Sequence, residues 1–313
     1  MSRRGRDPSY TRAGYLFLLP NFTGFLLFIL APVVASLVLS FCSWHIFNDP
    51  SPRFVGFANF AKLLASPEFW YYTWNTVFLM LGIPVGMALS LALAMLLNKG
   101  IRAIRLYRMV YFLPTISSGV ALLVLWLWIY NPSYGLMNYM LAKIGIEGPN
   151  WLAGGVQLPF LRDWFGIDAT CYWSKLALIL MGLWGGVGGY NMILYLAALQ
   201  GVPTSYYEAA EIDGAGPWSK FWAVTWPMIS PTTFFILVMS VIGGFQGGFM
   251  VANVMTGGGP AGSTTTVEYY LYQTAFEKFN MGYASAIAWF IFAVILVLTL
   301  VTWKLGGRVV TYE

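Results

Sequence analysis

The residue types most often used in catalysis are sparse in this sequence. Among 313 residues there is one histidine, His45, and there are two cysteines, Cys42 and Cys171. A Ser-His-Asp triad within the membrane needs a histidine inside a span, and an H-E-x-x-H zinc site needs two histidines, whereas His45 is the only one and lies just outside the first long apolar stretch. Two distant cysteines are too few for a metal cluster or a disulfide scaffold. We therefore expect no catalytic residue and no metal site on this chain.

A phosphate-binding loop of the Walker type is also absent, because no Gly-Lys dipeptide occurs. If ATP drives this protein, ATP and Mg²⁺ must be bound and hydrolysed on another chain. No cofactor is expected on this one.

A second group of residues, uncharged but polar or aromatic, lies inside or at the ends of apolar stretches. Hydroxyl, amide and aromatic groups of this kind suit a path for a neutral, sugar-like ligand. In an apolar helix the same side chains also hydrogen-bond between helices or simply pack. The candidate path residues are Trp184, Tyr190, Asn191, Gln246 and Asn253.

The elements that must position these residues are helices in lipid. The chain is 58% hydrophobic and only 9% charged, whereas soluble domains carry roughly 25% charged residues. Six segments are long and apolar enough to cross a bilayer, and none contains an acidic residue. They are residues 15–41, 73–97, 106–130, 176–199, 231–254 and 284–303. The first is too long for the core of a signal peptide, so we expect it to be retained.

The basic residues predict the orientation of these spans. Lys and Arg concentrate before the first span, in the loop 99–108 and after the last span. By the positive-inside rule, both termini face the cytoplasm. This placement explains the net charge of +5 without nucleic acid. The expected organisation is a cytoplasmic segment 1–14, a transmembrane domain 15–303 and a cytoplasmic tail 304–313.

Glycines recur in the fourth and fifth predicted spans at spacings that favour close helix packing. We interpret them as packing and sliding surfaces. They are Gly182, Gly185, Gly186, Gly189, Gly243, Gly244, Gly247 and Gly248.

The loop 203–230 between these two spans is the only sizeable cytoplasmic connection. Ser205 and Glu208 fit a capping box that would begin a helix, and Gly214 would end it in a left-handed conformation. Pro217 then suits the first turn of a second helix, which is expected to end before Pro227. Two short helices at an angle are predicted. With no partner, such a loop would lie on the membrane, where its tryptophans favour the headgroup layer.

The sequence of this loop resembles the EAA loop of binding-protein-dependent ABC import permeases. The resemblance rests on Glu208-Ala209-Ala210, Asp213-Gly214-Ala215, Phe221, Pro227 and Pro231. Further stretches are similar to the sugar-permease subfamily that serves maltose, trehalose, lactose and glycerol phosphate. They are 131–138, 256–265, 272–276 and 282–286, so that the resemblance covers roughly residues 15–305.

The resemblance implies an all-α, polytopic membrane protein with six transmembrane helices, in a bacterial-type plasma (inner) membrane. The loop 203–230 would be a coupling helix pair that docks on an ATPase through Glu208, Ala209, Ala210, Asp213, Gly214 and Ala215. The implied partners are a second, similar permease subunit, two ATP-binding-cassette ATPase subunits and an extracytoplasmic sugar-binding protein. The implied substrate is a disaccharide or oligosaccharide such as trehalose or maltose, and the chain is a transport subunit, not an enzyme.

Two rival interpretations stay open from the residues alone. Proton coupling is disfavoured, because the six apolar cores hold no ionisable group. A sodium-coupled secondary sugar carrier could use backbone carbonyls instead and is not excluded. A membrane anchor or assembly subunit without a path is the other alternative.

Overall fold

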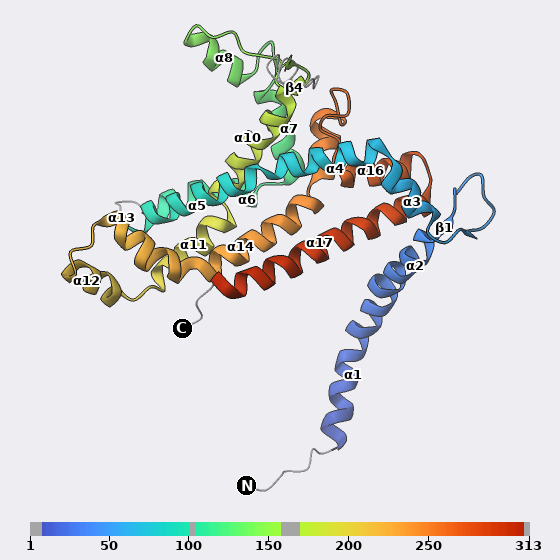
Figure 1. Cartoon of the computed structure of the whole chain (residues 1–313), viewed down its shortest axis with the longest axis horizontal. Coiled ribbons are helices and arrows are strands. Elements are labelled where there is room, and N and C mark those ends of the chain that lie inside the picture. The colour runs from blue at the N-terminus through green and yellow to red at the C-terminus, as the bar shows by residue number, and fades with distance from the viewer. Residues whose placement is uncertain (1–7, 100–103, 158–169, 310–313) are drawn as a thin grey trace. The chain divides into compact units, whose positions relative to one another are not determined.

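The computed structural model describes residues 8–99, 104–157 and 170–309, and the backbone in these ranges is almost entirely helical (Figure 1). Strands in these ranges form two short antiparallel pairs. β1 (Cys42–Ser43) pairs with β2 (Arg53–Phe54), and β3 (Gly155–Gln157) pairs with β4 (Thr170–Tyr172). The predicted all-α class is confirmed. The chain divides into two compact units.

The first unit combines residues up to Ala65 with the segment Leu271–Phe290. The Asn59 side-chain amide donates to the carbonyls of Ser40 and Cys42 at 2.9 and 2.8 Å, and Trp289 Nε1 donates to Ser36 Oγ at 3.2 Å. These bonds tie its helices together. Its helical elements are α1 (Pro8–Phe25), the π-helical segment η1 (Leu26–Leu30), α2 (Ala31–Ser40), α3 (Ala58–Ala65), the π-helical segment η4 (Gln273–Glu277) and the first part of α17 (Met281–Val309).

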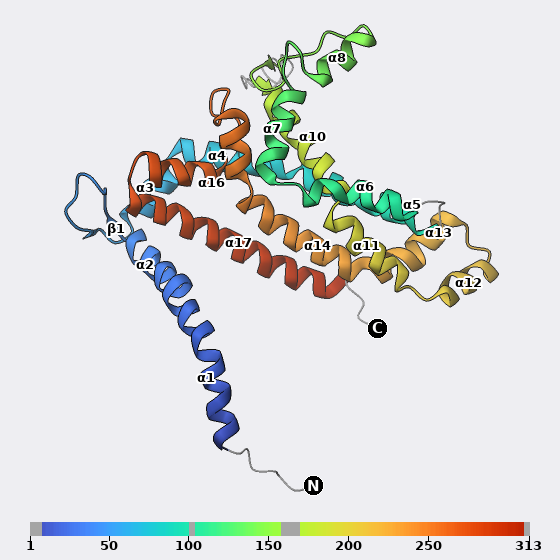
Figure 2. The same ribbon diagram turned by 180° about the vertical axis from the view of Figure 1, so that it is seen from behind.

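The second unit comprises Ser66–Tyr270 and the part of the chain from Ile291 onward, which includes the rest of α17. Its core lies where α5, α11 and α14 pack side by side, as both views show (Figures 1 and 2). Buried apolar side chains from all three helices meet there, including Leu91, Met192, Tyr195 and Ile229. Its helices are α4 (Pro67–Met80), α5 (Gly82–Asn98), α6 (Ile104–Ile116), α7 (Gly119–Ile129), α8 (Leu136–Lys143), α10 (Trp173–Val187), α11 (Tyr190–Gln200), α12 (Thr204–Ile212), α13 (Pro217–Lys220), α14 (Trp226–Gln246), α15 (Gly248–Val251) and α16 (Val267–Tyr272).

Four helical stretches among the described residues are long and apolar enough to cross a membrane. They are Gly14–Ser40, Pro67–Asn98, Pro217–Gln246 and Met281–Lys304. Two further candidates are bent pairs, so the number of spans is up to six. α6 and α7 meet at 98°, and α10 and α11 meet at 41°. The predicted third span, 106–130, corresponds to the bent pair α6 and α7, and the helix breaks at Ser117 and Ser118 just after Pro114.

The fifth span also differs from its prediction. The helix that begins at Pro217 does not end before Pro227 but continues to Gln246. A π-helical segment, η2 (Phe221–Thr225), precedes α14 and leads the helix into Pro227. Proline lacks an N–H, and a wider turn beside it is one way to relieve the strained hydrogen-bond ladder. At its other end the span stops at Gln246, eight residues earlier than predicted.

Candidate functional site

The loop between α11 and α14 contains two short helices, as the sequence predicts. α12 runs from Thr204 to Ile212, and α13 begins at Pro217 after the N-cap residue Gly216. The predicted capping box is wrong. The N-cap of α12 is Pro203, with no side-chain hydrogen bond at the cap, because the helix begins one residue before Ser205.

The end of α12 has the geometry of a Schellman motif. Gly214 takes a positive φ of 76°, its N–H donates to the Glu211 carbonyl at 3.0 Å, and the Ala215 N–H donates to the Ala210 carbonyl at 2.8 Å. These two bonds satisfy carbonyls that a helix end otherwise leaves open. The motif fixes the turn between the two helices, and it explains why glycine and small alanines occupy these positions.

Within the described part of the chain, no element covers the outer surface of the two-helix loop. Ile212 is 87% exposed and Trp218 is 74% exposed, although both are large and apolar. Glu208, Ala209, Asp213 and Gly214 are also exposed, while Ala210 and Ala215 are half-buried. Single exposed apolar residues are ordinary, but a contiguous exposed patch marks an interaction site.

The inner side of the loop is anchored to the second unit. The hydroxyls of Tyr207 and Thr225 lie 3.0 Å apart, and Lys220 forms an ion pair with Glu211 that joins the two short helices. Tyr207, Phe221 and Trp226 pack against the α5, α11 and α14 core. The loop is therefore attached to the transmembrane helices as a stiff element.

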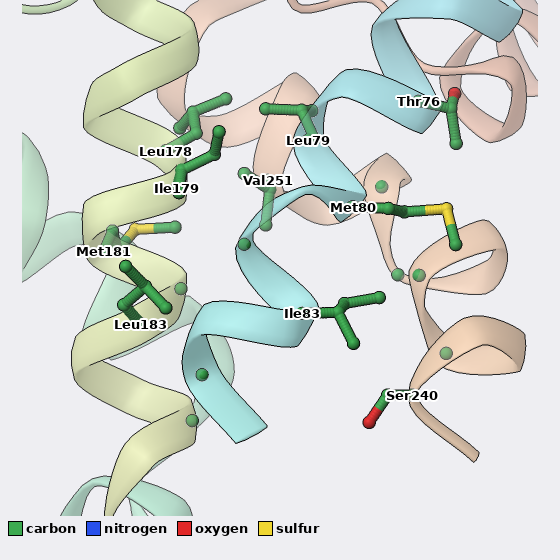
Figure 3. Close-up of a pocket in the computed structure, with 18 of the residues that line it drawn as sticks. Thr76, Leu79, Met80, Ile83, Leu178, Ile179, Met181, Leu183, Ser240 and Val251 are labelled. Carbon is green, nitrogen blue, oxygen red and sulfur yellow. The ribbon is translucent and has the colours of Figure 1, made fainter. Parts of the chain in front are cut away.

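A cavity of about 320 Å³ lies within the second unit, between α4, α5, α10, α14 and the segment that follows α14 (Figure 3). Its wall is mostly apolar and includes Leu79, Met80 and Ile83. The polar residues among the described lining are Thr76, Asn191, Ser240, Thr264 and Thr266. Ligand sites are commonly apolar cavities of this size with a few placed polar groups.

The structure does not bring the five predicted path residues together. Asn191 lines the cavity, whereas the other four are not among the residues described as its lining. Trp184 and Tyr190 are exposed and contact the rings of Trp126 and Phe112, respectively. Gln246 is exposed at the end of α14, and Asn253 is exposed in the π-helical segment η3 (Ala252–Thr256), beyond the break at Gly247.

Glycines, which we interpreted as packing surfaces, form much of the cavity wall. A β-carbon added at Gly182, Gly186 or Gly243 would meet no atom within 4 Å. These three glycines therefore leave open space. The packing interpretation holds for Gly244 and Gly248, where a β-carbon would lie 2.9 Å from Met80 and 2.5 Å from Thr266. The glycines of α10 and α14 are thus the residues by which the sequence could have indicated this cavity.

Titratable side chains are scarce near the cavity. Its described lining contains no Asp, Glu, Lys or Arg. Throughout the described part of the chain, no group of three or more His, Cys, Asp or Glu residues could hold a metal ion. The hydroxyl, amide and apolar groups that line the cavity suit the binding of a neutral polar molecule.

Comparison with known proteins places the chain among transport proteins. Residues 82–304 match the family described as "Binding-protein-dependent transport system inner membrane component". The chain is 33% identical to the probable ABC transporter permease protein YesP of Bacillus subtilis, over 96% of this chain and 92% of that protein. It is 35% identical to the lactose transport system permease protein LacF of Rhizobium radiobacter, over 95% of each.

The fold agrees with this relationship. A bacterial ABC transporter involved in the import of the acidic polysaccharide alginate matches with a TM-score of 0.79 and 25% identity. The match covers 99% of this chain and 100% of that one. With the helical architecture, the membrane spans and the family match over 82–304 in agreement, this chain belongs to the family of binding-protein-dependent transport system inner membrane components.

Proposed function

We propose that this chain is the translocation subunit of an ATP-driven sugar importer and that it couples to separate ATPase subunits through the α12–α13 loop. The observation that carries the proposal is the two-helix loop itself. Its Schellman turn and core contacts make it stiff, while its outer face is exposed in the part of the chain that the structure describes. A stiff element with an exposed face can bind a partner protein and transmit that partner's movement to α11 and α14.

The family match supports the partners that we propose. One relative's solved complex holds an alginate pentasaccharide-bound periplasmic protein, and we propose an extracytoplasmic sugar-binding protein for this chain as well. A second permease subunit and two ATPases that bind ATP and Mg²⁺ complete the assembly. We place the complex in the bacterial inner membrane, with both termini and the α12–α13 loop in the cytoplasm.

The substrate that we propose is a neutral disaccharide or oligosaccharide such as trehalose or maltose. Relatives are described as transporting sn-glycerol 3-phosphate, lactose and alginate. A phosphate or a uronate would favour cationic groups in its site, and the described cavity lining has none. The supporting features are the hydroxyl and amide groups of Thr76, Asn191 and Ser240 in an otherwise apolar wall.

The test is reconstitution of the whole complex, purified through a tag on this chain, in lipid vesicles. ATP hydrolysis is measured with the binding protein and a panel of trehalose, maltose, lactose, sn-glycerol 3-phosphate and alginate. We expect ATPase subunits to copurify and a neutral sugar to stimulate hydrolysis. Sugar uptake by this chain alone, driven by a sodium gradient without ATP, would contradict the proposal.

A further inference from the structure

A glycine-rich segment, residues 257–266, is held in place by two pairs of neighbouring residues from different helices. The α4 pair is Asn75 and Thr76, and the α10 pair is Ser174 and Lys175. Asn75 Nδ2 donates to the carbonyls of Gly262 and Thr265 at 2.8 and 3.1 Å. Thr76 Oγ1 accepts from the Val267 N–H at 3.0 Å, and Ser174 Oγ lies 3.5 Å from Ser263 Oγ.

Lys175 determines which way the Asn75 amide points. Its Nζ donates to Asn75 Oδ1 at 2.8 Å and lies 5.1 Å from the centre of the Phe78 ring. An ammonium group has donors only, so it fixes the amide oxygen on its own side. Both amide hydrogens are then directed at the two carbonyls of the segment. Because Asn75 is fully buried, these bonds do not compete with water.

The segment has an exposed tip and a buried base. Gly257 and Ala261 are exposed, whereas Ser263, Thr264, Thr265 and Thr266 are no more than 4% exposed. Thr264 and Thr266 of the base line the cavity together with Thr76. The groups that hold the segment therefore also build one end of the cavity wall.

We propose that Lys175 and Asn75 form a latch that holds segment 257–266 as the end wall of the cavity. Release of this latch opens the cavity to the side on which Gly257 and Ala261 are exposed. Both are positioning residues, which act by fixing the backbone of the segment. That the opening lies on the outer face of the membrane rests on the proposed function. The geometry of the latch does not depend on it.

The latch is tested by the reactivity of a buried reporter. Ser263→Cys is nearly isosteric and fully buried, and it is introduced after Cys42 and Cys171 have been replaced by Ser. Its labelling by a water-soluble maleimide is followed in permeabilised membranes containing the full chain. We expect Asn75→Ala and Lys175→Met to speed labelling by about tenfold, since the first removes both hydrogen bonds to the segment and the second removes the hydrogen bond that orients the Asn75 amide.

Three further variants separate the latch from general loosening. Asn75→Asp should also speed labelling, because a carboxylate still pairs with Lys175 but cannot donate to the two carbonyls. Lys175→Arg keeps a cationic donor and should label slowly, like the parent. Thr73→Ala, which loses only a bond to the Phe69 carbonyl of its own helix, should do the same.

Unchanged labelling in Asn75→Ala and Lys175→Met would overturn the latch, and so would equal acceleration in Thr73→Ala. Because labelling needs neither ATP nor sugar, this result is independent of the transport assay. A chain that fails to transport sugar but shows the expected labelling would refute the proposed function and leave the latch intact.

Discussion

A β-carbon at Gly188 would lie 2.2 Å from the main-chain oxygen of Tyr111, so α6 packs directly on the break between α10 and α11. The neighbouring Gly189 is similarly close to Thr115, at 2.9 Å. Both bent pairs of helices therefore meet at one place, where only glycine fits. α11 leads from this contact into the α12–α13 loop.

Gly188→Ala should destabilise the protein, because backbone atoms of α6 would have to move. Overpacking of this kind typically costs about 1–3 kcal/mol. The matched control is Gly185→Ala, three residues earlier in α10, where a β-carbon meets nothing within 4 Å. Thermal denaturation of the two purified variants checks this, and equal melting temperatures would show that the contact is not tight.

Filling the cavity should block transport without unfolding the protein. Gly182 lines the cavity and has open space around its β-carbon position, so Gly182→Leu places a side chain in that space. Gly185→Leu is the control, since Gly185 also has open space but is not among the described lining residues. We expect sugar-stimulated ATP hydrolysis to fall at least about tenfold in Gly182→Leu only, as a blocked site predicts. Equal activity of both variants would place the path elsewhere.

Glu268 should make stability depend on pH in a direction opposite to that of most carboxylates. Burial raises the pKa of its carboxyl above the ordinary value of 4.5, although the N–H groups of Phe249 and Gly248 oppose this by hydrogen bonding to it. The folded protein then binds the proton more tightly than the unfolded chain. The stability that this group contributes is complete below pH 4.5 and is lost as pH rises through the raised pKa.

The comparison variant is Glu268→Gln, which resembles the protonated acid at every pH. Below about pH 4.5 the melting temperature of Glu268→Gln should match that of the parent. As pH rises, it should exceed the parent's by a growing margin. Glu277→Gln, at an exposed glutamate, serves as control. A gap between Glu268→Gln and the parent that stays constant, or that narrows as pH rises, would contradict this prediction.

Gly214→Pro should uncouple the loop while leaving the transmembrane helices folded. Proline cannot adopt the positive φ of Gly214, and it also removes the N–H that bonds to Glu211. The control is Gly216→Ala, where φ is −71° and no atom lies near the added β-carbon. ATPase copurification and stimulated hydrolysis should be lost in Gly214→Pro only. Retention of both activities in Gly214→Pro would argue against coupling through this turn.

Local sequence signals predicted the features that depend on neighbours along the chain. Long apolar stretches indicated the spans, and Gly214 and Pro217 indicated the turn and the start of the second helix. These positions constrain backbone dihedrals directly. The motif at 208–215 is likewise a contiguous set, and the structure gives it a physical basis in the Schellman bonds.

Features that depend on packing between distant segments could not be predicted in this way. Pro227 was expected to lie beyond the end of a helix, but it lies inside a continuous helix, just after a π-helical segment. The local sequence did not indicate this outcome. Gly182 and Gly244 have the same residue type and similar spacing, yet one borders open space and the other touches Met80. Only the positions of neighbouring helices separate the two cases.

The coupling claim is tested most directly by cross-linking from Ala209, which is exposed on α12. A photoreactive amino acid is placed at Ala209 in the complete complex, and a second complex carries it at Tyr134, an exposed residue between α7 and α8. If α12 docks on the ATPase subunit, Ala209 should cross-link to that subunit with a yield that changes when ATP is added, and Tyr134 should not. Absence of an ATPase cross-link from Ala209 in a complex that transports sugar would contradict it.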